Sequence, residues 1–114
     1  SKKIIASSGS GAMNTASEIN FLNIAGTLNS SSSVAGYVYA TQSPSTGHVG
    51  AIWSVVGAAN SLLIEEISKR QISAGGSTPN LSLSSPSSGV LRIDPFWAFN
   101  QNGYTWFIDL LVSN

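Results

Sequence analysis

The sequence predicts an all-β fold, an antiparallel β-sandwich of jelly-roll type in a single domain with an extended N-terminal arm. Two observations lead to this prediction. From residue 18 onward, short apolar stretches alternate with clusters of Gly, Pro, Asn and Ser, as they do in sandwiches and barrels. The chain has 114 residues and no cysteine, a length that supports one hydrophobic core without disulfide bonds. We therefore expect an arm at residues 1–17 and a sandwich domain at residues 18–114.

The arm is rich in Ser, Gly and Ala after a short basic and apolar start. Such a composition normally frays in solution, so we expect the arm to be held by a partner. The residues predicted to anchor it are Lys2, Lys3, Ile4, Ile5 and Met13. The alternative is that the segment packs on the sheet of its own domain.

The first half of the domain contains three predicted strands, at residues 18–25, 34–41 and 48–56. The turns between them contain Ser, Asn, Pro and Gly, which are the usual turn residues. Residues 48–56 (HVGAIWSVV) are apolar at nearly every position. This strand is therefore predicted to be buried on both faces.

Residues 61–72 (SLLIEEISKRQI) are open to two interpretations. Glu65 precedes Lys69, and Glu66 precedes Arg70, by four residues, the spacing of ion pairs on a helix. The apolar residues of the segment nevertheless form no helical stripe. We favour a strand, and a short helix at residues 61–70 is the alternative.

The second half of the domain contains strands predicted at residues 81–84, 90–94 and 104–112. Pro95 is expected to end the second of these, and Asn102-Gly103 suits a hairpin connection because both residues tolerate positive φ. In residues 104–112 (YTWFIDLLV) both alternating sets of side chains are largely apolar. We therefore expect both faces of this last strand to be covered.

The charge pattern points to association. Only 9% of the residues are charged and the formal net charge is zero, whereas Ser supplies 22 residues, Gly 11 and Asn 9. Near-zero net charge on a fairly apolar chain favours association, so we expect an obligate oligomer. The sequence lacks the basic stripe of a nucleic-acid-binding protein. It also lacks an apolar run long enough to span a bilayer, so we expect neither nucleic acid nor membrane as partner.

Catalysis is not expected. His48 is the single histidine, and no serine lies in the Gly-x-Ser-x-Gly sequence of a nucleophile elbow. One histidine with scattered carboxylates does not make a metal site, and we expect no cofactor.

The aromatic residues are the candidate binding residues. Trp53 and Trp106 lie inside apolar strands and are expected in the core. Residues 95–99 (PFWAF) place three large rings within four positions beside a loop rich in Asn and Gln, more than one short strand can bury. Aromatic side chains are enriched at protein interfaces. The predicted oligomer interface consists of Phe96, Trp97, Phe99 and Tyr104.

The order of several segments resembles the trimeric β-sandwich modules of bacteriophage virions, which occur as tail-fibre tips and as head-decoration or head-fibre proteins. The segments are GYVYA at 36–40, GAIWSVVG at 50–57, PNLSLS at 79–84, SGVLRI at 88–93 and the strand at 104–112. The resemblance implies a homotrimer without catalytic residues, made in the host cytoplasm and carried on the virion. Its partners would be other virion proteins, such as a major capsid protein.

Three roles remain open. The short chain starts like a gene product that has lost its initiator Met, so we expect a capsid decoration (cement) component anchored through its arm. The first alternative is a tail-fibre tip that recognises host surface glycans. The second is a small sugar-binding lectin, whose site the aromatic and Asn side chains would supply.

Overall fold

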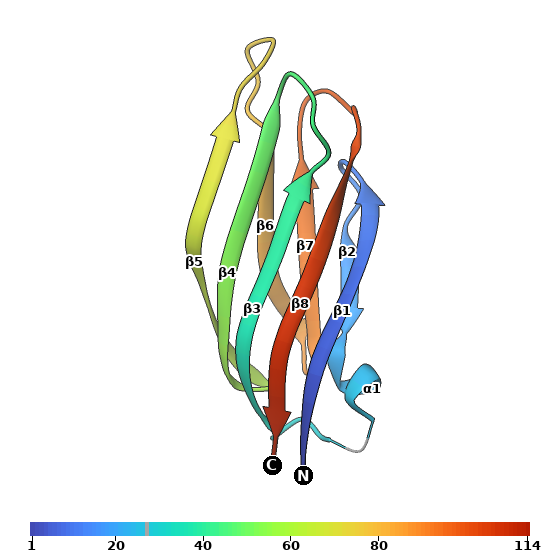
Figure 1. The fold of residues 1–114 in the computed structure, drawn as a ribbon, viewed down its shortest axis with the longest axis vertical. Coiled ribbons are helices and arrows are strands. Elements are labelled where there is room, and N and C mark those ends of the chain that lie inside the picture. Colours follow the sequence, from blue (N-terminus) through green and yellow to red (C-terminus); the bar gives the residue numbers. More distant parts are fainter. Residues whose placement is uncertain (27) are drawn as a thin grey trace.

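Residues 1–26 and 28–114, which the computed structural model describes, form a β-sandwich of eight strands and one short helix (Figure 1). The all-β prediction is therefore confirmed. The elements are β1 (Lys2–Ala12), β2 (Ser17–Asn20), α1 (Phe21–Ala25), β3 (Ser33–Gln42), β4 (His48–Ala58), β5 (Ser61–Ile72), β6 (Asn80–Ser87), β7 (Val90–Phe96) and β8 (Gly103–Ser113).

The strands form two antiparallel sheets that pack face to face. The larger sheet has the order β1-β8-β3-β4-β5 and the smaller one the order β2-β7-β6. The first and last strands are neighbours, so the two chain ends lie side by side (Figure 1). The amino group of Ser1 donates a hydrogen bond to the carbonyl oxygen of Asn114 at 3.2 Å.

The core lies between the sheets, because each strand turns alternate side chains inward. In β8 the side chains of Tyr104, Ile108 and Leu110 are buried, and across the core Leu91 and Ile93 of β7 are fully buried. Trp53 is also buried and Trp106 partly buried against the same core. Both tryptophans therefore have the core positions predicted for them.

Residues 1–17 belong to the sandwich. β1 pairs with β8 along its whole length, from Lys2 opposite Ser113 to Ala12 opposite Gly103. Ile5 and Met13 are buried in the core. The segment is therefore not an arm separate from residues 18–114. The backbone hydrogen bonds to β8 supply the order that the composition alone did not predict.

The segment predicted as a strand at residues 18–25 divides into β2 and the helix α1. The side chain of Asn20 caps the helix by accepting a hydrogen bond from the backbone N–H of Asn23 at 3.0 Å. Gly26 ends the helix with a φ of +82°, a conformation that favours glycine. The four-residue spacing of Phe21 and Ala25 turns both buried side chains to the same side of this short helix.

Residues 61–72 form the strand β5, which settles the open choice between strand and helix. A bulge in β5, opposite the step from Ile52 to Trp53, shifts the register between β4 and β5. It brings Glu66 and Lys69 into an ion pair at 2.8 Å.

β7 continues through Pro95 to Phe96, so the expected break at Pro95 is wrong. Pro95 lies opposite Leu81 of β6, whereas β2 pairs only with residues 90–93 of β7. At Pro95 the strand therefore has a partner on one side only, which is where strands tolerate proline.

Candidate interaction surface

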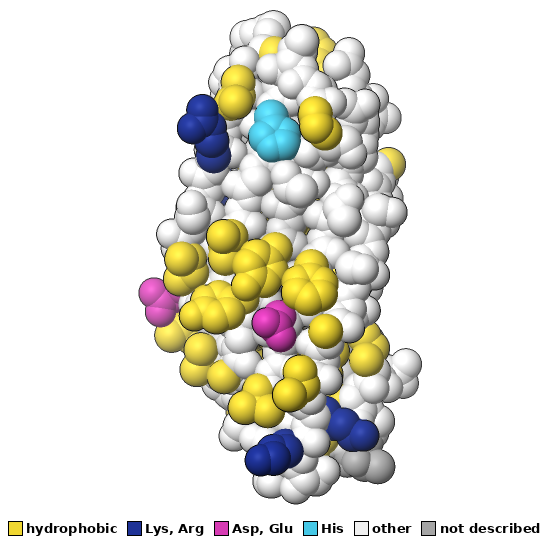
Figure 2. Space-filling view, viewed as in Figure 1, with side chains coloured by type: hydrophobic (Ala, Val, Ile, Leu, Met, Phe, Trp, Pro, Cys, Tyr) yellow, Lys and Arg dark blue, Asp and Glu magenta, His cyan; other side chains and the backbone are white. Residues whose placement is uncertain are grey.

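The outer face of the five-stranded sheet carries large apolar side chains in exposed positions. Leu63 is 60% exposed, Val56 50% and Leu111 45%. Figure 2 shows such side chains gathered on the face formed by this sheet. Large contiguous apolar surfaces of this kind mark interaction sites. We call the following set the exposed apolar patch: Ile4, Tyr37, Tyr39, Val56, Leu63, Phe107 and Leu111.

The strand register arranges part of the patch as a row across all five strands. Ile4 of β1 lies opposite Leu111 of β8, and Leu111 lies opposite Ala35 of β3. Ala35 lies opposite Val56 of β4, which lies opposite Leu63 of β5. Residues opposite each other on one face of a sheet are in contact distance. The row is therefore a continuous apolar band across the width of the sheet.

Four residues further along the strands, the patch is aromatic. Tyr39 lies between Phe107 of β8 and Ile52 of β4. Its ring centroid is 5.9 Å from that of Phe107, at an interplanar angle of 35°, and 6.4 Å from that of Tyr37. Rings in this arrangement hold each other in fixed orientations. The face therefore presents a rigid aromatic surface.

Two exposed carboxylates lie between the apolar row and the aromatic row. Asp109 is opposite Tyr37 on one side, and Glu65 is opposite Ser54, the neighbour of Tyr37 on the other side. No salt bridge among the described residues includes either carboxylate. An occupant of this face must therefore supply hydrogen-bond donors or cations to them, because burying an unpaired charge is costly.

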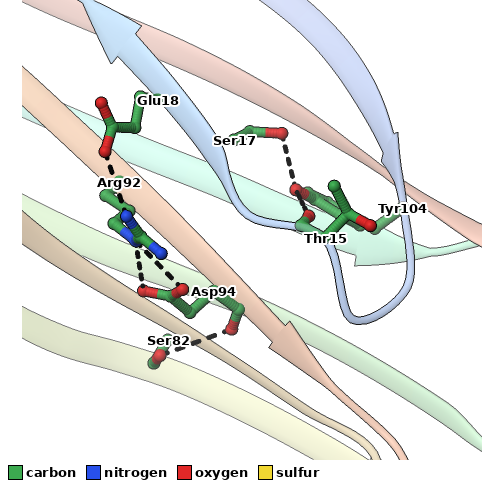
Figure 3. Close-up of polar contacts among 7 residues, drawn as sticks. All are labelled: Thr15, Ser17, Glu18, Ser82, Arg92, Asp94 and Tyr104. Carbon is green, nitrogen blue, oxygen red and sulfur yellow. Dashed lines mark hydrogen bonds and ion pairs between the residues drawn. The ribbon is translucent and has the colours of Figure 1, made fainter.

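The outer face of the three-stranded sheet has a different character. Arg92 of β7 contacts Glu18 of β2 at 3.1 Å and Asp94 of its own strand at 3.1 Å (Figure 3). The hydrogen bonds and charges of Asp94 and then of Glu18 raise the pKa of Arg92 above its ordinary value. This face therefore carries an ion-pair network in place of the apolar row, although Phe96 of β7 is also exposed on it.

A hollow of about 430 Å³ lies on the outer face of the five-stranded sheet, beside the aromatic row. Gly50 has no side chain, and it lies opposite Thr41 of β3 and Arg70 of β5. The small side chains of this row leave the surface lower than the rings beside it. The hollow is lined by Tyr39, Ala40, Thr41, Gly50, Ala51, Ile52, Ser68, Arg70, Thr105, Trp106 and Phe107.

The predicted interface residues do not form one surface. Trp97 is 2% exposed and Tyr104 1% exposed, so both belong to the core of one chain and their assignment to a contact surface is wrong. The hydroxyl group of Tyr104 bonds to the Ser17 hydroxyl at 2.6 Å and donates to the Thr15 carbonyl at 2.9 Å (Figure 3). Phe96 and Phe99 are exposed, and their role in an interface stays a prediction.

The predicted anchoring residues also fall into an exposed group and a buried group. Lys2, Lys3 and Ile4 are exposed at the start of β1, whereas Ile5 and Met13 are buried and unable to touch a partner. Ile4, 80% exposed, belongs to the exposed apolar patch.

The patch was not predicted from the sequence, because β4 and β8 are apolar at both alternating sets of positions and were therefore expected to be covered on both faces. In β8 the set containing Phe107 and Leu111 is exposed, and in β4 the outer residues range from half-buried to exposed. The signal was present in the apolar residues at both alternating positions. One sandwich layer can cover only one of the two faces.

His48 is half-buried at the start of β4, on the outer face, with its Nε2 3.5 Å from the Thr41 hydroxyl. Among the described residues, no three His, Cys, Asp or Glu side chains gather in a group suited to a metal ion. In the same part of the chain, no helix is long and apolar enough to cross a membrane.

No protein-family model matches the chain, and no curated protein matches its sequence. Among solved structures, the chain is similar to the tailspike protein of the Acinetobacter phage vB_ApiP_P1, with 11% sequence identity and a TM-score of 0.46. The similar region covers 99% of this chain and 22% of the tailspike chain. The chain therefore spans less than a quarter of the length of that protein.

Proposed function

We propose that the chain is a non-enzymatic structural component of a bacteriophage virion that assembles with copies of itself through the exposed apolar patch. The patch carries this proposal. Its apolar row crosses all five strands, and it lies on one side of a sandwich whose other side carries an ion-pair network. Burying such a surface is favourable at about 25 cal/mol per Å².

The attribution to a virion rests on the resemblance of residues 36–112 to phage sandwich modules. Within that class, attachment to a capsid as a decoration protein is the role we favour. Lys2 and Lys3 are exposed at one end of β1 and lie outside the exposed apolar patch, so they form the part of the predicted anchor that a capsid protein can reach, whereas Ile4 belongs to the patch. The alternatives are a tail-fibre tip and a lectin, both of which require a glycan site.

The oligomeric state tests the proposal. Light scattering on the purified chain should give a particle of three times the 11.8 kDa chain mass. Leu111→Asp should reduce the mass to that of a monomer, because it would add a third carboxylate, next to Asp109, to a contact that already contains Asp109 and Glu65. Ser84→Asp, which adds the same charge to an exposed site on the smaller sheet, should leave the oligomer intact.

A stable 11.8 kDa monomer at micromolar concentration would refute assembly through this patch. Equal effects of the two substitutions would show that added charge, and not its position, dissociates the oligomer. Binding of the intact chain to purified phage heads, and loss of that binding with Lys2→Gln and Lys3→Gln together while light scattering shows the oligomer intact, would support the capsid role.

A further inference from the structure

The hollow beside the aromatic row differs from the rest of the outer face in shape. On its floor, Gly50 lies opposite Thr41, and Thr41 lies opposite Thr105 of β8. Two residues along each strand, the next row on the same face carries Phe107, Tyr39 and Ile52. A row of small side chains thus adjoins a row of large ones. In Figure 2 this part of the face lies between the gathered apolar side chains and the histidine.

The wall of the hollow suits a ring with an apolar face. Tyr39 and Phe107 are 36% and 39% exposed, and both line the hollow. Their rings hold each other at 5.9 Å, so little side-chain freedom is lost when a ligand packs on them. The C–H face of a pyranose ring is apolar and flat, and aromatic side chains with exposed faces can pack against it.

The rest of the lining is mostly apolar, and its polar side chains are those of Thr41, Ser68, Arg70 and Thr105. The hydroxyl groups of Thr41, Ser68 and Thr105 can each donate and accept a hydrogen bond. Such groups match the hydroxyl groups of a sugar, which also do both.

Arg70 gives the hollow its charge. It is exposed on β5 opposite Gly50, and it takes part in none of the salt bridges found among the described residues. The lining includes no Asp or Glu. A guanidinium group binds a carboxylate or sulfate through two parallel hydrogen bonds. A ligand that fits this site therefore carries an anionic group next to a ring.

We propose that the hollow is a binding site for an anionic saccharide, with one sugar ring packed on Tyr39 and its carboxylate or sulfate group paired with Arg70. Thr41 and Thr105 supply hydrogen bonds to the sugar hydroxyls. Tyr39 and Phe107 belong to the exposed apolar patch, whereas the apolar row that contains Leu111 and Leu63 lies four residues away along the strands. The saccharide site therefore requires that the contact between copies use the apolar row and leave these two rings accessible.

An array of carboxylated, sulfated and neutral oligosaccharides, probed with the intact chain, tests the ligand class. We expect binding to anionic sugars, and the two anionic groups on the array distinguish carboxylate from sulfate. NMR titration with the best array ligand should shift the backbone amide signals of Thr41, Gly50 and Arg70. Absence of binding to every anionic sugar would overturn the proposal.

Substitutions locate the site. Gly50→Val fills the floor, and the strand tolerates it because the nearest atom to a Cβ at Gly50 would be the Thr41 hydroxyl oxygen, at 3.5 Å. We expect this change to abolish binding. Ser54→Val adds a similar side chain on the same face of the same strand, outside the lining, and should leave binding unchanged.

Arg70→Gln should weaken binding of the anionic sugar by about tenfold or more, since a charged hydrogen-bonded pair is lost. Lys3→Gln, which removes an exposed cation from β1, is the control. Equal loss with both variants would show general attraction of anions and overturn the site. Shifts caused by a peptide from another virion protein, with none caused by sugars, would identify the hollow as a protein contact and overturn the saccharide.

Discussion

The side-chain amide of Asn14 hydrogen-bonds to both backbone groups of Trp97. Its Nδ2 donates to the Trp97 carbonyl at 2.9 Å, and its Oδ1 accepts from the Trp97 N–H at 2.9 Å. Asn14 has a φ of +67°, in the turn between β1 and β2. The Trp97 ring packs edge-on against Phe99, with centroids 5.2 Å apart. One asparagine thus fixes the aromatic segment that closes this end of the sandwich.

Asn14→Gly should lower the free energy of unfolding by about 1–3 kcal/mol, because the buried backbone groups of Trp97 lose both partners. Glycine keeps the positive φ without strain, so the loss reports the hydrogen bonds. Urea unfolding followed by tryptophan fluorescence measures it. Asn102→Gly, at another residue with positive φ (59°) whose side chain bonds to the exposed Pro44 carbonyl, should cost less. Equal costs would contradict this role of Asn14.

The sequence predicts the strand segments well where one face is apolar and the ends carry turn residues. β3, β4 and β8 lie within a few residues of their predicted positions. It does not predict β1, whose residues from Ala6 to Ala12 are small and of weak strand propensity. That strand is ordered by its pairing with β8, a contact between the two ends of the chain. Only the three-dimensional fold shows such a contact.

The same limit explains the misplaced interface. The density of rings in residues 96–99 suggests an exposed cluster, but Trp97 has a place in the core because Gly47 leaves room for its ring. A Cβ at Gly47 would lie 2.2 Å from that ring. The exposed patch instead combines residues from five strands, and no short stretch of sequence reveals it.

Gly36→Ala should prevent folding or destabilise the sandwich by more than about 3 kcal/mol. A Cβ at Gly36 would lie 2.0 Å from the backbone oxygen of Asp109, and in a central strand the backbone cannot move without disturbing its neighbours. Gly50→Ala is the matched control, since its Cβ meets nothing nearer than 3.5 Å. Circular dichroism during thermal unfolding compares the two. Similar melting temperatures for both variants would show that the sheet accommodates a side chain at Gly36.

Tyr104→Phe should reduce stability by about 1–2 kcal/mol without changing the oligomeric state. The hydroxyl group joins β8 to Ser17 at the start of β2 and to the Thr15 carbonyl in the preceding turn, and its removal leaves a polar group unpaired. Denaturant unfolding measures the first effect and light scattering the second. Dissociation of the oligomer by this variant under conditions where each chain stays folded would return Tyr104 to the contact surface.

Deletion of residues 1–14 should unfold the domain. The deletion removes the whole of β1, the buried side chains of Ile5 and Met13, and the hold of Asn14 on Trp97. Large-to-alanine losses at buried positions such as Ile5 cost about 2–5 kcal/mol each, which is comparable with the total stability of a small domain. Circular dichroism and dye binding should therefore report an unfolded or aggregating chain.

The truncated chain cannot test attachment, because a truncated chain that fails to bind phage heads has lost its fold as well as its anchor. The suitable variant is the double substitution Lys2→Gln and Lys3→Gln, which changes exposed side chains of β1 outside the exposed apolar patch. It should retain the circular dichroism spectrum, melting temperature and oligomeric state of the intact chain while binding to heads weakens. If the double variant binds heads as tightly as the intact chain, the start of β1 is not the anchor. If the truncated chain folds cooperatively, the pairing of β1 with β8 is not required for the sandwich.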